Sequence, residues 1–403
     1  MGKFRQALAI LTTCTLALFI VFMARINIKT SMPVPNPPLP AIKKYTNIPV
    51  PYCTHTILVA DPRVGSTFLD DPLQKFWPIL NSFAEHTDSH SCILIHTLAS
   101  GVCDGTSKSL PNDEIRFPPS FINNPDFKSN APHLHQLIIT SRVRMINLDY
   151  EKYGLRCANW NPLRVWMRVD YWNDEFVHEH YTANWVLTVQ TDTVMCRKFD
   201  LSKWQKFAFV GGIWPKRHCH LMENMWRNWH TNFGEVPAFF PPATATSSAF
   251  CPERGLVGNG GLSFRSREHM IRAIKYCPSE KFSSLPQQAV LESSCAIRKP
   301  RGGPNEDMYY AALMAGLKFN MPTPFEAAIF SSDTETMKVT QAAFNVSEEE
   351  VKIHLENFGL EYSSSDDGRQ MPIGVHKIKT IIEGKSDYID FITTNCEVVT
   401  NLL

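Results

Sequence analysis

Short apolar runs alternate with stretches of helical periodicity from about residue 53 onward. Strand-like runs are found at residues 56–60, 92–98, 136–140, 143–148, 185–189 and 207–210. Helical patterns are found at residues 73–83, 161–180 and 344–358, and further helices are expected after Ser266 and after Asn305. This alternation predicts an α/β fold in which helices connect the strands of one sheet.

Glycine and proline modify this pattern at three places. Pro78 is expected to interrupt the helix at 73–83. Residues 101–132 are polar and rich in Pro, Asn and Ser, which predicts a surface loop. Residues 257–266 are expected to form a glycine-dense loop that leads into a short strand, with Ser266 as the N-cap of the helix that follows.

The N-terminal segment has the pattern of a membrane anchor. Residues 7–24 carry no charge, and these 18 residues are just long enough to cross a bilayer as a helix. Lys3 and Arg5 precede them, and Arg25 and Lys29 follow them. The terminal amine makes the leading end slightly more positive, so this end is expected to stay in the cytosol. The predicted organisation is a cytosolic tail at 1–6, a transmembrane signal anchor at 7–24, a Pro-rich stem at 25–52 and one luminal domain at 53–403. A cleaved signal peptide is the alternative.

Composition narrows the class of protein. With 403 residues, of which 44% are hydrophobic, the chain can bury a large core, which excludes a disordered or fibrous protein. The net charge of +1 provides no field that would favour nucleic acid. Ten of the eleven cysteines follow the anchor, and none has C-x-x-C spacing. This usage fits disulfides in the lumen of the Golgi or endoplasmic reticulum, as does the acceptor sequon at Asn345.

A polar cluster follows the apolar run at 185–189. It consists of Gln190, Thr191, Asp192 and Thr193. In an open α/β sheet, ligands bind beyond the carboxyl ends of strands, so Asp192 is a candidate residue for a metal or phosphate site. One carboxylate is sufficient for Mg²⁺ or Mn²⁺, because these ions take further ligands from water and phosphate. The alternative is an Asp that stabilises a turn at the end of a strand.

The glycine-dense segment is a second candidate part of a site. Gly260 and Gly261 let the backbone approach a bulky ligand, and the neighbouring Asn259 offers hydrogen bonds to a sugar. A purely conformational role for these glycines is the alternative.

Two further segments carry acid and base groups. Glu306 and Asp307 open a helical pattern, and an acid fixed at the start of a helix is well placed to act as a general base. The favourable charge of an acid near a helix N-terminus is the structural alternative. His376 can complete the coordination of a metal and Lys377 can meet a phosphate, although most histidines have ordinary packing roles.

Six motifs occur in a characteristic order: Q-T-D-T, F-V-G-G-I-W-P, G-N-G-G-L-S-F-R-S, E-D-M-Y-Y, F-E-A-A-I-F-S and G-V-H-K. Together with the opening I-L-V-A-D-P-R, they resemble a family of uncharacterised GT-A-like glycosyltransferase domains, from about residue 57 to 377. The layout is similar to that of the inverting β-1,4-galactosyltransferase group. The chain departs from that group because Gln190 replaces the first acid of the D-x-D motif.

The resemblance implies a GT-A-like, Rossmann-like mixed sheet flanked by helices, and a transferase for nucleotide-sugars. Asp192 and His376 would bind Mn²⁺ or Mg²⁺, Asp307 would deprotonate the acceptor hydroxyl, and Glu306 would orient the acceptor. The implied substrate contacts are Asp61, Arg63, Gln190, Thr191, Asn259, Gly260, Gly261, Ser263 and Lys377.

The expected partners are a nucleotide-sugar donor and a hydroxyl acceptor on a glycan, protein or lipid. The expected reaction inverts the sugar configuration. A luminal glycan-binding or scaffold protein that has lost catalysis is the first alternative. A metal-dependent phosphate-ester hydrolase ranks last, because such enzymes gather several carboxylates and histidines around two ions, and the sequence has no dense cluster of them.

Overall fold

The computed structural model describes the chain in thirteen segments: residues 52–64, 69–71, 74–98, 112–149, 151–153, 162–178, 183–214, 256–276, 306–317, 319–332, 347–362, 370–376 and 389–402. The predicted cytosolic tail, anchor and nearly all of the predicted stem lie outside these segments, as does the sequon at Asn345. Within the described segments, no helix combines the length and the apolar character that a membrane span requires.

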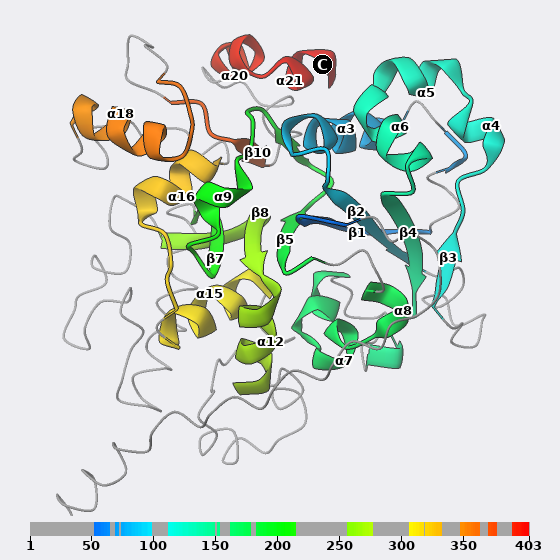
Figure 1. Ribbon diagram of the computed structural model, residues 1–403, viewed down its shortest axis with the longest axis horizontal. Helices are drawn as coiled ribbons and strands as arrows, with labels where there is room; N and C mark the ends of the chain where they lie inside the picture. The colour runs from blue at the N-terminus through cyan, green and yellow to red at the C-terminus, as the bar shows by residue number, and fades with distance from the viewer. Residues whose placement is uncertain are drawn as a thin grey trace, which may run out of the picture. The chain divides into compact units, whose positions relative to one another are not determined.

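The described residues form a seven-stranded mixed sheet in the order β3-β4-β2-β1-β5-β8-β7 (Figure 1). Four central strands are parallel, namely β4, β2, β1 and β5, whereas β3, β8 and β7 are antiparallel to their neighbours. The parallel strands read as nearly continuous apolar runs because both faces of the sheet are covered. The bounds are β1 Thr56–Val64, β2 Cys92–Leu98, β3 Asp113–Ile115, β4 Val143–Leu148, β5 Trp185–Val189, β7 Phe209–Trp214 and β8 Leu256–Ser266.

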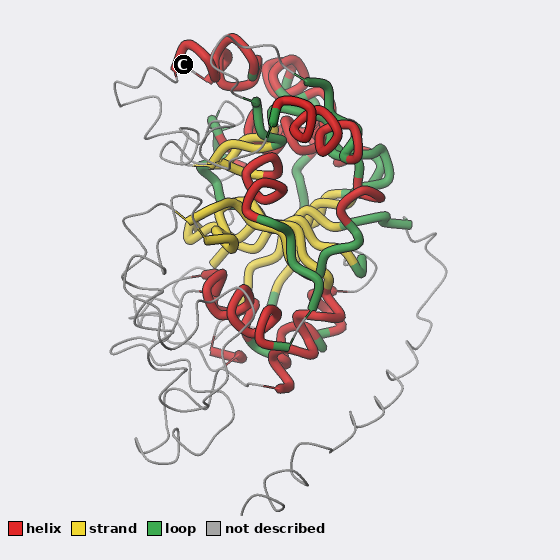
Figure 2. The backbone as a smooth tube through the Cα atoms, turned by 90° about the vertical axis from the view of Figure 1, so that its left-hand side faces the viewer, coloured by secondary structure: helices red, strands yellow, loops and turns green. Residues whose placement is uncertain are grey.

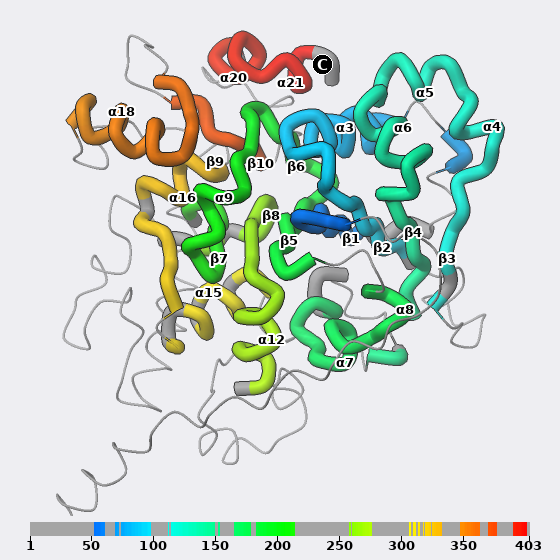
Figure 3. Tube along the Cα trace, viewed as in Figure 1, coloured from blue at the N-terminus to red at the C-terminus, as the bar shows by residue number. Residues whose placement is uncertain are grey.

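A second, three-stranded sheet follows the turn after β5. Its order is β6-β10-β9, with β10 antiparallel to β6 and parallel to β9. Although these strands are far apart in the chain, they lie side by side beyond β5 and β8 (Figure 3). Their bounds are β6 Thr193–Met195, β9 Ser331–Ser332 and β10 Gly374–His376.

Helices cover both faces of the large sheet, as Figure 2 shows from the side. The first face packs against α3 Phe76–His86, α5 Pro125–Asn130, α6 Pro132–Ile139, α18 Glu348–Asn357, α20 Ile389–Asn395 and α21 Glu397–Leu402. The second face packs against η3 Pro162–Met167, α7 Val169–Trp172, α8 Glu175–His178, α12 Arg267–Tyr276 and α15 Glu306–Gly316. The shorter helices α4 Pro119–Ile122, α9 Leu201–Trp204 and α16 Pro324–Phe330 add residues to the core on the first face, and η1 Glu151–Tyr153 adds Tyr153 to the core on the second.

The two faces of the large sheet differ in polarity. We call the first the apolar face, because most of its strand residues are hydrophobic: Ile57, Val59, Ile93, Ile95, Leu187, Val189, Leu262 and Phe264. Thr97 and Asn147, which form a hydrogen bond near the ends of β2 and β4, are exceptions. We call the second the mixed face, because buried polar side chains interrupt the apolar ones along it. Its strand residues include Leu58, Leu94, His96, Val186, Thr188, Ser263 and Arg265. Successive side chains of a strand point to opposite faces, so one set of strands builds both.

Several predicted elements are confirmed, and others are wrong in instructive ways. The strand at 92–98 and the strand at 143–148 are confirmed as β2 and β4. Ser266 immediately precedes α12, and its hydroxyl accepts a hydrogen bond from the backbone N–H of His269, as predicted for an N-cap. Pro78 does not interrupt its helix, because it lies in the first turn of α3, where its missing N–H has no intrahelical partner to lose.

The short apolar run at 136–140 is helical rather than extended, because it continues α6, which begins at Pro132. The expected long helix at 161–180 is divided into η3, α7 and α8. The described part of the expected loop at 101–132 contains β3, α4 and α5. The glycine-dense segment is no loop either, since β8 runs through all of it as one strand.

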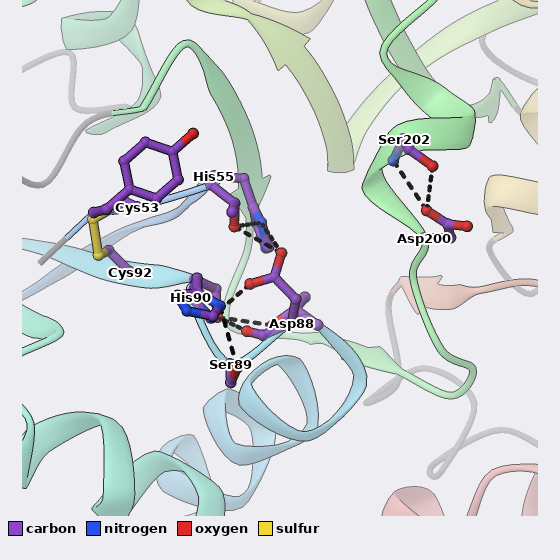
Figure 4. Close-up of polar contacts among 12 residues, drawn as sticks. Cys53, His55, Asp88, Ser89, His90, Cys92, Asp200 and Ser202 are labelled. Atoms are coloured by element: carbon purple, nitrogen blue, oxygen red, sulfur yellow. Dashed lines mark hydrogen bonds and ion pairs between the residues drawn. A yellow bond between two sulfur atoms is a disulfide. The ribbon is translucent and has the colours of Figure 1, made fainter.

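Two disulfides lie in the described part of the chain and use all four of its cysteines. Cys53 and Cys92 connect the segment before β1 to the start of β2, beside the buried His55 and its neighbour Asp88 (Figure 4). Cys196 and Cys396 connect the end of β6 to the segment between α20 and α21.

Candidate functional site

The turn between β5 and β6 contains the predicted Gln190, Thr191 and Asp192. Two hydrogen bonds to the carbonyl oxygen of Gly261 hold it against β8, one from the backbone N–H of Gln190 at 2.9 Å and one from the hydroxyl of Thr193 at 3.0 Å. The buried residues of β5 before the turn and of β6 after it anchor both ends. The turn therefore has a fixed position at the carboxyl end of β5.

His376 reaches this turn from β10, where it pairs with Thr193 of β6. Its Nε2 atom lies 3.0 Å from Oε1 of Gln190 and 3.4 Å from Oδ1 of Asp192. The imidazole is buried, whereas the Asp192 side chain is 41% exposed and faces the outside of the protein. The structure thus brings together two residues that are far apart in the sequence and were predicted to bind one metal ion.

Gly260 and Gly261 provide the space for two candidate side chains. A Cβ atom at Gly261 would lie 2.3 Å from the ring of His376. A Cβ atom at Gly260 would lie 2.5 Å from the Cβ of Asp307, whose carboxylate accepts a hydrogen bond of 3.1 Å from the Gly260 N–H. Any larger residue at either position would displace a candidate functional group.

A bulge in β8 surrounds these glycines. Ser263 pairs with Gly211 of β7, but the next pair is Asn259 with Gly212, so residues 260–262 have no partner on β7. Bulges of this kind bend a strand and redirect its residues, and they are common beside active sites. Here the bulge turns the Gly260 N–H toward α15 and the Gly261 carbonyl toward the turn after β5.

A buried polar layer lies directly behind the two glycines on the mixed face. Arg265 of β8 forms an ion pair with Glu306 of α15, and both side chains are almost completely buried. The Nε of Arg265 donates to the hydroxyl of Ser263 at 2.7 Å, and this hydroxyl lies 2.5 Å from that of Thr188. Burial raises the pKa of Glu306 to about 7, while Arg265 opposes the rise and Asp307 adds to it.

Two residues with predicted substrate roles belong to this layer. Ser263 was expected to border the sugar and Glu306 to orient the acceptor, but both side chains lie inside the fold and point into the buried layer. Asp307 differs from its neighbour, because its carboxylate lies against Gly260 at the bulge and its side chain is 8% exposed. The two consecutive acids therefore have different environments.

Arg265 and Thr188 complete the buried layer, although they were not predicted as site residues. The available signal was an arginine directly after Leu262, Ser263 and Phe264, at a position whose strand neighbours are buried. The side chains of Asp61, Arg63 and Asn259 lie outside the described part of the structure, and so does Lys377. Their predicted contacts with substrate stay predictions.

The atoms around His376 suit a divalent cation. Oδ1 of Asp192, Oε1 of Gln190 and Nε2 of His376 form a mixed oxygen and nitrogen donor set, which is acceptable to Mn²⁺ and Mg²⁺. Neighbouring ligands of an octahedral ion with bonds of about 2.1 Å lie roughly 3 Å apart, close to the separations of 3.0 and 3.4 Å found here. Among the described residues, no group of three or more His, Cys, Asp and Glu side chains could hold a metal. A cation here would thus need ligands from the substrate or from water.

A separate cavity of about 860 Å³ lies between α3, α5 and the segment of α20 and α21. It is lined mainly by polar residues, including Asn81, His86 and Asn395, and by the Cys196–Cys396 disulfide. None of the predicted site residues lines it. The candidate groups Asp192, His376 and Asp307 instead meet around the bulge in β8.

Comparisons with known proteins give few matches in sequence and weak ones in structure. Residues 171–349 match a family described as a protein of unknown function (DUF5672). This range contains Gln190, Asp192, the glycines of β8 and the acids of α15, but it ends before His376. No curated protein sequence matches the chain.

Among solved structures, the chain is similar to the galactosyltransferase LgtC in complex with donor and acceptor sugar analogues, at 10% identity over 80% of this chain and 86% of LgtC, with a TM-score of 0.35. It is similar to mouse xyloside xylosyltransferase 1 at 10% identity over 80% of this chain and 96% of that one, with a TM-score of 0.33. The match to the bifunctional glycosyltransferase WbbM, at 10% identity and a TM-score of 0.36, covers 88% of this chain and 51% of WbbM. TM-scores below 0.5 do not establish a common fold, so the reaction is inferred below from residues of the chain itself.

Proposed function

We propose that the chain is a glycosyltransferase of the GT-A type, which transfers a sugar from a nucleotide-sugar to a hydroxyl group of a glycan, protein or lipid. One observation carries the proposal. Adjacent glycines of β8 make room for Asp307 from α15 and for His376 from β10, and His376 in turn contacts the Asp192 turn. Such a transfer requires a base for the acceptor hydroxyl and a group that stabilises the leaving diphosphate.

Asp307 is the proposed general base. Its carboxylate takes the proton of the acceptor hydroxyl while the hydroxyl oxygen forms a bond to the anomeric carbon of the donor. The bond between that carbon and the diphosphate oxygen breaks in the same step, and the nucleoside diphosphate leaves with the electron pair. A single displacement of this kind inverts the configuration at the anomeric carbon. The hydrogen bond from the Gly260 N–H fixes the orientation of the carboxylate.

The turn after β5 is the proposed diphosphate end of the site. Asp192 and His376 would hold a divalent cation there, with Gln190 beside them. When bound, such an ion neutralises the charge that develops on a leaving diphosphate. The two hydrogen bonds to the Gly261 carbonyl hold the turn in place before the substrate arrives, which avoids reorganisation during the reaction.

The proposed location is the lumen of the Golgi or endoplasmic reticulum, behind an N-terminal anchor. The two disulfides support an oxidising compartment. Residues 7–24 have the length and composition of an anchor helix.

Release of free nucleotide from a panel of UDP- and GDP-sugars tests the proposed activity. The protein is incubated with Mn²⁺ and simple sugar acceptors, and the anomeric configuration of the product is read by NMR. Asp307→Asn is expected to lower the transfer rate by about 10²–10⁴-fold, the usual contribution of a general base. Binding of the nucleotide-sugar should be largely retained, because the proposed role of Asp307 concerns the acceptor hydroxyl and not the diphosphate.

Asp126→Asn is the matched control, since Asp126 is also an acid in the first turn of a helix but lies exposed on α5. Its transfer rate should equal that of the wild type. An unchanged rate in Asp307→Asn would remove Asp307 from the mechanism. Binding of nucleotide-sugars without any release of nucleotide would favour a sugar-binding protein over a transferase.

A further inference from the structure

The strand β8 contacts the first turn of α15 at two points. The Gly260 N–H donates to the carboxylate of Asp307 at 3.1 Å. Five residues further along the strand, Arg265 forms an ion pair with Glu306. Two consecutive acids of one helix are thus fixed to two points of one strand, and only the first of these contacts involves a residue with a proposed role in the reaction.

Arg265 itself has little freedom to move. Its side chain is fully buried, and its Nε donates to Ser263, which contacts Thr188 of the neighbouring strand. Its guanidinium carbon also lies 4.8 Å from the ring centre of Phe209 and 5.4 Å from that of Tyr310, distances at which a cation and an aromatic ring attract each other. The guanidinium therefore has a fixed orientation. It is set by the strand pairing of β8, by the hydroxyls of Ser263 and Thr188, and by the rings of Phe209 and Tyr310.

Stability alone does not account for this buried pair. Two charges lose their hydration when they are buried, and well-packed apolar residues of similar volume are often as stable or more stable in their place. The rest of the core between α15 and the mixed face is aromatic and aliphatic, with Phe209, Tyr309 and Leu313. It could therefore accommodate apolar residues in place of the ion pair. The ion pair fixes the orientation of the Glu306 carboxylate, because a guanidinium that cannot move holds a carboxylate in one orientation.

We propose that Arg265 and Glu306 form a positioning pair, which sets the rotation and depth of the first turn of α15 so that the carboxylate of Asp307 meets the Gly260 N–H. This inference rests on the proposed function for the role of Asp307. Glu306 and Asp307 are consecutive residues of a helix, so a shift of the Glu306 side chain turns the backbone that carries Asp307. A displacement of about 1 Å in a catalytic group can lower a rate by roughly 10²-fold.

The decisive variant replaces both members of the pair, Arg265→Met together with Glu306→Leu. It removes both charges, keeps most of the volume and leaves no unpaired ion in the core, so we expect it to fold. The expected result is a fall in kcat of about 10²-fold with an unchanged KM for the nucleotide-sugar. Glu306→Gln is the second variant, because the amide keeps the shape of the side chain and a hydrogen-bonding oxygen for Arg265 while it removes the charge. Its kcat should lie between those of the double variant and the wild type.

The matched control is another Arg–Glu pair, Arg144→Met together with Glu114→Leu. Arg144 of β4 and Glu114 of β3 are 3.0 Å apart at the opposite edge of the sheet. Because this pair contacts neither α15 nor the bulge in β8, its removal should leave kcat unchanged. A fall in kcat that occurs only in the Arg265 and Glu306 double variant would assign the effect to position rather than to the general loss of an ion pair.

A second measurement separates this inference from the proposed function. Hydrogen exchange of the Gly260 amide reports its bond to Asp307 directly, whether or not the protein transfers a sugar. Faster exchange at Gly260 in the double variant than in both the wild type and the Arg144 control would support the positioning pair, even if no nucleotide-sugar proved to be a substrate. Unchanged exchange at Gly260 together with unchanged kcat would overturn it.

Discussion

The two faces of the large sheet use the same strands for different purposes. On the apolar face, residues such as Val59, Ile95 and Leu187 are fully buried against α3 and α6. On the mixed face, the same strands present His96, Thr188 and Arg265 to the helices that cover it. One step along a strand changes the face to which a side chain points, so the strands carry both patterns at once.

This difference indicates that one face mainly stabilises the fold and the other mainly supports the site. A buried polar group costs free energy unless it is hydrogen-bonded or paired, and the apolar face, which avoids that cost, supplies most of the stability. On the mixed face, buried polar groups fix the orientation of side chains near the site. The polar layer lies directly behind the glycines of the bulge. Changes to the apolar face should therefore affect folding, and changes to the mixed face should affect the site and the response to pH.

The largest expected effect on stability comes from the apolar face. Leu187→Ala should lower the free energy of unfolding by about 2–5 kcal/mol, because it removes a fully buried side chain and leaves a cavity. Urea denaturation followed by circular dichroism measures this loss, and the folded fraction should keep the kcat of the wild type. Ile139→Ala is the control, since Ile139 is 50% exposed and its truncation should change stability by less than about 0.5 kcal/mol. Equal losses in the two variants would break the comparison.

The disulfides should give the next largest effect. Cys196 and Cys396 belong to the core of the apolar face and are 200 residues apart in sequence, whereas Cys53 and Cys92 are only 39 apart. Replacing Cys196 and Cys396 by Ala should lower the free energy of unfolding by about 2–4 kcal/mol. The same change at Cys53 and Cys92 should cost about 1 kcal/mol less, because the shorter loop restricts the unfolded chain less. Thermal unfolding under non-reducing conditions measures both, and a larger loss for the shorter loop would contradict the prediction.

The smallest effect concerns pH and belongs to the mixed face. Burial, together with the nearby positive charge of Arg144, lowers the pKa of His96 to about 3. The folded state therefore keeps His96 neutral while the unfolded chain takes up a proton below the usual value of 6.5, so stability falls as the pH drops from about 6.5 toward 3. In His96→Gln this fall should be less steep. His133→Gln is the control, because His133 lies exposed on α6 and its replacement should leave the slope unchanged.

Much of the apolar face could be predicted from the sequence, because continuous runs such as I-L-V-A and C-I-L-I identify buried parallel strands by themselves. The same reasoning placed Asp192 at the carboxyl end of β5, where the structure has it. It failed at Gln136–Thr140, because so short an apolar run does not distinguish a strand from a helix. The helix α6, which begins at Pro132, continues through this run.

The mixed face and the site were harder to predict, because the roles of their residues depend on contacts between distant segments of the chain. A glycine-dense sequence predicts a loop, but pairing with β5 and β7 on both sides holds β8 extended through its bulge. Nothing in the sequence connects Arg265 of β8 with Glu306 of α15, because their ion pair forms only when the helix packs on the strand. Only the family resemblance gave the neighbouring acids Glu306 and Asp307 different roles, because their different surroundings depend on how α15 packs on β8.

The paired glycines of β8 also limit how this protein can change over evolution. At Gly260 and Gly261 the wall of the site is bare main chain, and any side chain there would collide with Asp307 or His376. A mutation at either position that adds a side chain to contact a ligand would also displace Asp307 or His376. A shift in what the site accepts must therefore originate in the surrounding segments, while this short stretch of backbone stays the same.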